Sequence, residues 1–129
     1  MTPFLLLAAA AGGAIGAALR LAVVLGALRV FGADFPWGTM IVNVAGSLIM
    51  GLLIGYMALK HPGGEMWRAF LATGVLGGFT TFSAFSLDFA LLWERKAHLA
   101  ALGYAAGSVL LSLAAVFIGL AAARSLWQG

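Results

Sequence analysis

The chain has 129 residues, of which 64% are hydrophobic and only 9% carry a charge. Soluble domains average about 45–50% apolar and about 25% charged residues, so this chain lacks the polar surface that would cover a water-soluble globule. The net charge of +3 comes from scattered basic residues, which argues against a nucleic-acid partner, and the absence of cysteine excludes disulfides and thiolate metal sites. We therefore expect a single all-α membrane domain over 1–129.

Four apolar segments are long enough to cross a bilayer, which needs about 20 mostly apolar residues. In chain order they cover about 3–30, 37–59, 67–93 and 98–124, with short connections. The first segment lacks the basic start of a signal peptide and stays apolar beyond any cleavage site, so we predict a membrane helix there. Tryptophan rings prefer the headgroup level. They mark the predicted segment ends at Trp37, Trp67, Trp93 and Trp127.

The first segment carries Arg20 near its end and the pair Gly12 and Gly16, whose spacing is typical of helices that pack closely. An arginine in this position either snorkels to the headgroups or pairs with Asp88 of the third segment, which runs in the same direction. The second interpretation predicts an ion pair at a pore mouth. The close-packing spacing recurs on later segments, at Gly51 and Gly55 and at Gly103 and Gly107.

Polar side chains repeat every four residues on the second and fourth segments, so each row lies on one helix face. The rows are Thr39, Asn43 and Ser47, and then Tyr104, Ser108 and Ser112. Such side chains either hydrogen-bond neighbouring helices or their own backbone, or they line a hydrated track. Asn43 is the residue least tolerated without hydrogen-bond partners in a bilayer, because its amide carries two donors and an acceptor.

The third segment is interrupted in its middle by GGFTTFSAF, residues 77–85. Glycine and β-branched threonine weaken a helix, and a break frees backbone groups that lipid cannot satisfy. The break is therefore either a kink satisfied by neighbouring hydroxyls or an ion site in which carbonyls face a cation and a helix N-terminus faces an anion. Phe82, Phe85 and Phe89 follow at helical spacing, and the positive edges of their rings could contact an anion.

Basic residues are balanced between the two sides of the predicted bundle. Three lie on the side of the termini and three on the opposite side: Lys60, Arg68 and Arg124 against Arg29, Arg95 and Lys96. Because a lysine and arginine excess sets the orientation of a membrane protein, this balance leaves the orientation almost unspecified. Either the N-terminus determines the orientation, or the chain inserts in both directions and pairs antiparallel with itself.

Three motifs resemble those of the Fluc/CrcB family of fluoride channels: GAIGAALR ending at Arg20, GTMIVNVAGS in 38–47 and GGFTTFSAF in 77–85. The third motif is the most specific, and the resemblance extends over the whole chain. It implies an antiparallel, dual-topology homodimer with two pores in the cell (inner) membrane. It also implies passive fluoride efflux, which lowers fluoride toxicity, and no enzyme activity.

The resemblance further implies the site residues. The backbone carbonyls of Gly77 and Thr80 would bind a structural sodium ion at the dimer centre, completed by the second subunit, and Arg20 would lie in the vestibule. The fluoride pathway would be lined by Asn43, Thr81, Phe82, Ser83, Phe85, Tyr104, Ser108 and Ser112. The chain departs from the family pattern at Ala84, where threonine is frequent. The role of that hydroxyl is then missing or taken by a neighbouring serine.

Two other functions also fit a short four-helix membrane protein. A dual-topology multidrug exporter needs a buried carboxylate to couple protons to cationic drugs, typically in its first helix. The first segment here has Arg20 and no acidic residue, and Asp88 is the only candidate. A purely structural membrane subunit would leave Asn43, the hydroxyl rows and the break without a role.

Overall fold

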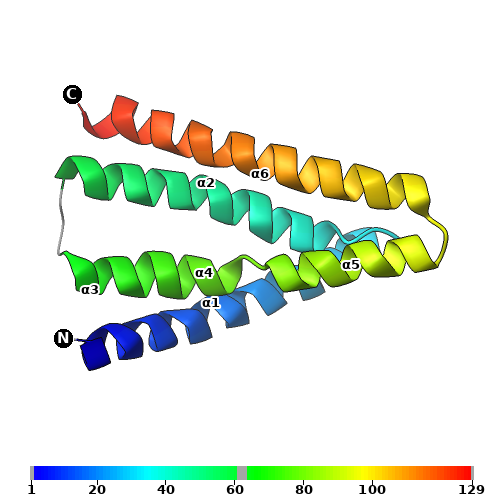
Figure 1. Ribbon diagram of the computed structural model, residues 1–129, viewed down its shortest axis with the longest axis horizontal. Coiled ribbons are helices and arrows are strands. Elements are labelled where there is room, and N and C mark those ends of the chain that lie inside the picture. The colour runs from blue at the N-terminus through cyan, green and yellow to red at the C-terminus, as the bar shows by residue number, and fades with distance from the viewer. Residues whose placement is uncertain (1, 61–63, 129) are drawn as a thin grey trace.

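Four long helical spans lie side by side in the computed structural model, which describes residues 2–60 and 64–128 (Figure 1). The first, second and fourth spans are α1 (Thr2–Phe31), α2 (Trp37–Lys60) and α6 (His98–Trp127). The third span is divided into α3 (Glu65–Arg68), the π-helix η1 (Ala69–Leu76), α4 (Gly77–Phe79) and α5 (Phe82–Glu94). The prediction of four helices long and apolar enough to cross a membrane is thus confirmed. The predicted second connection falls partly on residues 61–63, outside the described residues.

The outer surface of the bundle is apolar. Leu6 on α1 and Phe117 on α6 each expose 67% of their surface, and all four spans are long and apolar enough to cross a membrane. Water-soluble monomers rarely expose apolar surface on this scale. The chain is therefore a multi-pass membrane protein, with both termini at the same end of the bundle (Figure 1).

The most extensive helix contact joins α2 and α6. A Cβ added at Gly51 of α2 would lie 2.3 Å from the carbonyl oxygen of Val116, and one at Gly119 of α6 would lie 2.4 Å from that of Leu48. The two backbones touch here, so the predicted close packing at Gly51 is confirmed. Gly103 was predicted to do the same, but a Cβ there would meet nothing within 4 Å. This face of α6 points outward, so close packing at Gly103 does not occur within the subunit, and its packing against another chain stays a prediction.

Gly51→Ala is expected to lower the melting temperature of the protein in detergent, because the added methyl would overlap the Val116 carbonyl and force α2 from α6. Overpacking of this kind costs about 1–3 kcal/mol. Gly26→Ala is the matched control, since a methyl on this exposed face of α1 would enter open space. Thermal unfolding followed by tryptophan fluorescence measures both variants, and equal melting temperatures would contradict the described contact.

The first and third spans form a second pair, in which α1 packs along η1 and α4. The residues of η1 form a π-helix, a rare conformation that is found frequently at functional sites. No residue pattern in this segment predicted the π-helix. Figure 1 shows the third span bending directly after this paired half, between α4 and α5.

Candidate functional site

The predicted break of the third span lies at Thr80 and Thr81. Both residues have extended backbones, with ψ angles of 157° and 122°, and the helix resumes at Phe82. Thr80 stays bound to the first half, because its N–H and its hydroxyl each donate to the Leu76 carbonyl at 3.0 Å. Thr81 caps the second half, because its hydroxyl accepts a hydrogen bond from the Ala84 N–H at 3.1 Å.

Asn43 of α2 binds the break from the side. Its Oδ1 accepts a hydrogen bond from the Thr81 N–H at 2.7 Å, and its Nδ2 donates to the Thr81 carbonyl at 3.0 Å. The side-chain amide of Asn43 therefore pairs both the N–H and the carbonyl of Thr81, two backbone groups for which lipid offers no hydrogen-bond partner. An amide has two donor hydrogens, so Asn43 retains one N–H for a further acceptor.

The same hydrogen bonds free two carbonyl groups at the break. In a continuous α-helix the Gly77 carbonyl would accept from the N–H of Thr81, and the Thr80 carbonyl from the N–H of Ala84. The first N–H donates to Asn43 and the second to the Thr81 hydroxyl. Carbonyl oxygens released at the end of a half-helix can coordinate a cation such as sodium. The donor set at Gly77 and Thr80 therefore fits the metal ion that the resemblance implies.

A groove of about 380 Å³, here called the central groove, opens beside the break. Its walls come from α2, from the break with the start of α5, and from α6. The lining residues are uncharged throughout the described ranges, and those with polar or aromatic side chains are Asn43, Ser47, Thr80, Thr81, Phe82, Phe85, Ser108 and Ser112. The structure thus gathers six of the eight predicted pathway residues around one groove.

The other two predicted pathway residues lie next to the groove. Tyr104 is fully buried behind it, with its ring centroid 5.2 Å from that of Phe85. Ser83 is exposed on α5, and its hydroxyl oxygen lies 3.4 Å from that of Thr81. The two serines of α6 differ as well, since Ser108 is buried and Ser112 only partly so.

Ser108 is the most unusual polar residue of the groove. Only 4% of its surface is exposed, and its hydroxyl has no hydrogen-bond partner within the described chain. Buried polar atoms are nearly always paired, so an unpaired one calls for an explanation. A ligand that enters the groove and accepts a hydrogen bond would supply the missing partner.

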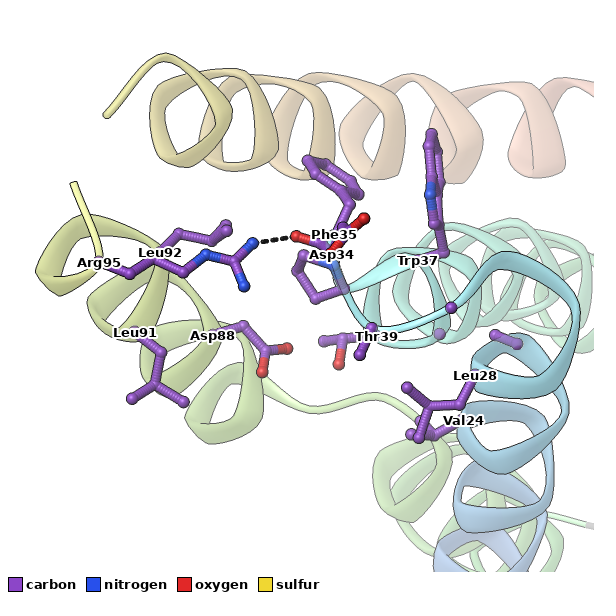
Figure 2. A pocket seen from close by; sticks show the side chains of 15 residues that line it. Val24, Leu28, Asp34, Phe35, Trp37, Thr39, Asp88, Leu91, Leu92 and Arg95 are labelled. Atoms are coloured by element: carbon purple, nitrogen blue, oxygen red, sulfur yellow. Dashed lines mark hydrogen bonds between the residues drawn. The ribbon is translucent and has the colours of Figure 1, made fainter. Parts of the chain in front are cut away.

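A second hollow of about 270 Å³, here called the end cavity, lies where α1 ends and α2 begins (Figure 2). Arg95 at the end of α5 donates from Nη2 to the backbone carbonyl of Asp34 and so ties α5 to the connection between α1 and α2. Figure 2 shows the Asp88 carboxylate below this contact, facing Thr39 of α2. Asp88 also accepts a hydrogen bond from the Tyr104 hydroxyl at 3.1 Å. The polar row of α2 thus runs from the end cavity to the central groove, and Tyr104 links the row of α6 to Asp88 of the end cavity.

The predicted ion pair between Arg20 and Asp88 does not form in the described chain. Arg20 donates from Nε to the Gly78 carbonyl at 3.0 Å, while Asp88 binds Tyr104. The prediction was wrong because it placed Arg20 by its distance from the helix end, whereas α1 packs against the first half of the third span. The sequence does contain a pattern that could have predicted the contact between Asp88 and Tyr104. The two residues lie symmetrically about Lys96 in the α5–α6 turn, so they face each other across it.

Asp88→Ala and Tyr104→Phe are expected to be non-additive in stability, because each removes the same hydrogen bond. The coupling energy should be about 1.5–3 kcal/mol, as for a hydrogen bond to a carboxylate. Asp88→Ala combined with Arg20→Ala should instead be additive. Denaturant unfolding of the single and double variants provides both comparisons. Additivity for Asp88 with Tyr104, or strong coupling of Asp88 with Arg20, would contradict the described contacts.

The fold and the site together define a small multi-pass membrane protein with a broken third span and an uncharged polar groove beside the break. The family model described as "CrcB-like protein, Camphor Resistance (CrcB)" matches residues 7–120. The chain belongs to this CrcB family, as its three motifs predicted.

Curated relatives match the chain over almost its whole length. A protein of Mesorhizobium japonicum named "Fluoride-specific ion channel FluC" is 54% identical over 123 residues, which cover 95% of this chain and 98% of the relative. Proteins with the same name from Hyphomonas neptunium and Caulobacter sp. are 56% and 52% identical and cover 98% and 95% of this chain. These matches cover 99% and 97% of the two relatives.

Proposed function

We propose that this chain is a fluoride-selective channel through which fluoride leaves the cell passively across the inner membrane. The observation that carries the proposal is the central groove, where an interrupted membrane helix, serine and threonine hydroxyls and phenylalanine rings meet with no charged side chain among the described lining residues. The names of its relatives agree with this function. Passive transport of an ion makes and breaks no covalent bond, so the chain is not an enzyme.

The groove offers the contacts that a small anion needs in exchange for its water. Donors are available from the Ser108 hydroxyl and from the remaining N–H of Asn43. The rings of Phe82 and Phe85 line the same space, 5.6 Å apart between centroids, and aromatic edges are weakly positive. The start of α5 adds the positive end of a helix dipole. Conduction requires binding that is weak enough for release, and uncharged donors meet this requirement.

The direction of transport follows from the acid–base chemistry of fluoride. Hydrogen fluoride is a weak acid that crosses membranes in its neutral form and dissociates in the cytoplasm, where the anion is trapped. A passive channel lets the anion leave down its gradient and so lowers its toxicity. The groove contains no carboxylate among its described lining residues, which offers no support for a proton-coupled drug exporter.

Growth of a bacterium that lacks its own fluoride export tests the function in cells. Expression of this chain should restore growth at fluoride concentrations that stop the parent strain, and intracellular fluoride should fall. A chain present in the membrane at normal levels that changes neither growth nor intracellular fluoride would contradict the proposal.

We propose further that two copies form an antiparallel homodimer across the central groove. The balanced basic residues leave each copy free to insert in either direction. Phe82, at the edge of the groove, exposes 78% of its surface, and Gly103 presents a flat face of α6 on which another backbone could pack. A second copy would cover the open side of the groove.

The absence of cysteine makes the orientation directly measurable. Gln128→Cys introduces one thiol next to the C-terminus, and a membrane-impermeant maleimide labels only the copies whose C-terminus faces outward. Intact cells should contain both a labelled and a protected population, and the protected one should react after the cells are permeabilised. A single population, either wholly labelled or wholly protected, would rule out dual topology.

A sodium ion is proposed as the structural cofactor of this dimer. The carbonyls of Gly77 and Thr80 would bind it together with the same pair from the second copy, because two carbonyls are too few for a hard cation. When bound, the ion supplies a fixed positive charge between the two breaks. Replacing sodium by N-methylglucamine should lower the melting temperature of the purified dimer, and an unchanged melting temperature would contradict the cofactor.

A further inference from the structure

Arg20 is a charged residue inside a membrane span that lines neither the central groove nor the end cavity. It is partly buried, and its Nε donates to the Gly78 carbonyl at 3.0 Å. Intramembrane charges are costly and mark function. The contact therefore raises the question of what an arginine does at the break itself.

The sequence of α1 carries Arg20 to this position. Gly12, Gly16 and Arg20 follow at intervals of four residues and so share one helix face. A Cβ at Gly12 would lie 2.2 Å from the Phe70 carbonyl oxygen, and one at Gly16 would lie 2.0 Å from that of Val75. The two backbones are in direct contact along this face, so the next residue of the row reaches the end of the first half of the third span.

The contact between α1 and the third span is also close at Gly78. A Cβ at Gly78 would lie 2.6 Å from the Gly13 carbonyl oxygen. Gly78 is thus packed against the backbone of α1, and its own carbonyl is available to Arg20 one helical turn beyond Gly16. The position of the break relative to α1 is fixed by these glycines and by a single side-chain donor.

The hydrogen bonds at the break show which backbone carbonyls are occupied and which one stays free beside the Arg20 contact. The Leu76 carbonyl accepts from both groups of Thr80, and the Gly78 carbonyl accepts from Arg20. The Gly77 carbonyl lies between them. The Thr81 N–H, which would donate to it in a continuous helix, donates to Asn43 instead. The carbonyls on both sides of Gly77 are therefore occupied, and Gly77 remains free.

We propose that Arg20 is the C-terminal cap of the broken span and a positioning residue for its ion site. By occupying the Gly78 carbonyl it holds the end of the first half-helix in place, so that the Gly77 carbonyl beside it and the Thr80 carbonyl two residues further on stay free for the ion. A guanidinium has five donors and no acceptor, and a cation is stabilising at the C-terminal end of a helix. The inference rests on the proposed function for its ion, and on the described hydrogen bond for its geometry.

Two variants with side chains of matching length distinguish the effect of the capping hydrogen bond from the effect of the positive charge. Arg20→Gln places the Nε2 donor of glutamine where the arginine Nε lies, but removes the positive charge. Arg20→Met matches the same chain length and has no donor. Arg29→Met is the control, since Arg29 is exposed in the last turn of α1. Hydrogen exchange of residues 76–84 followed by mass spectrometry, the sodium-induced rise in melting temperature, and fluoride efflux are measured for all three.

If Arg20 is the cap, the methionine variant exchanges about tenfold faster at residues 76–84, because a carbonyl at the break has lost its donor. It should also lose most of the sodium-induced stabilisation and about tenfold in efflux. The glutamine variant should stay near wild type in exchange and in sodium response, and so should Arg29→Met.

The inference is overturned if both Arg20 variants keep wild-type exchange and sodium response and lose flux equally, since charge alone would then account for Arg20. It is also overturned if neither variant changes any of the three measurements. The exchange readout needs neither fluoride nor sodium. Failure of the wild type to conduct fluoride would therefore defeat the proposed function without deciding the role of Arg20.

Discussion

Asn43→Ala is expected to reduce fluoride flux by at least about 30-fold, because it releases both backbone groups of Thr81 into an environment that cannot satisfy them. Each unsatisfied buried group costs about 1–3 kcal/mol, so the ordered break would become a minor state. The variant also removes the one Asn43 N–H that remains for an anion. Efflux from liposomes containing equal amounts of each protein measures the effect.

Ile41→Ala is the matched control for this variant. Ile41 lies two residues away on α2 and exposes 38% of its surface, so its truncation should leave flux and the break unchanged. Wild-type flux in Asn43→Ala would show that the break does not need the amide. A loss in both variants would point to general damage to α2.

Phe82→Ile and Phe85→Ile are each expected to lower fluoride flux by at least about tenfold, equivalent to about 1.4 kcal/mol in the barrier. Isoleucine keeps the apolar bulk but has no ring edge to contact an anion. Phe82 is 78% exposed at the groove edge, so its replacement should barely change the stability of the subunit. Phe85 packs against Tyr104, and some loss of stability is expected there.

Phe89→Ile provides the comparison for the two ring variants. Phe89 continues the same helical stripe, but its ring stacks on Trp93 at a centroid distance of 6.0 Å. Its replacement should therefore leave the flux intact. Unchanged flux in both groove variants would remove the rings from the pathway, and equal losses in all three would indicate packing as the cause.

Much of the fold could be predicted from local sequence, because a membrane simplifies the problem. Apolar length alone defined the four spans, and the glycines and threonines of residues 77–81 located the break within one turn. The spacing of the polar rows on α2 and α6 correctly predicted two polar faces. These features depend on residues close together in the chain, so their patterns are visible without a structure.

The contacts between spans could not be predicted in the same way. Arg20 and Asp88 were expected to lie toward the same membrane face, yet the glycine contacts place Arg20 opposite Gly78. Gly78 precedes Asp88 by ten residues and lies on the other side of the break. The choice of Gly51 over Gly103 as a packing site is likewise a property of the assembled bundle. Asn43 was predicted to line the pathway, but its two hydrogen bonds to Thr81 could be found only from the register of α2 against the break.

The most direct test of the account is simultaneous fluoride and chloride efflux from liposomes loaded with both anions and containing the wild-type protein. Ion-selective electrodes follow each anion while a potassium ionophore balances charge. We expect rapid release of fluoride and retention of chloride. No fluoride release, or chloride release at the same rate, would contradict it.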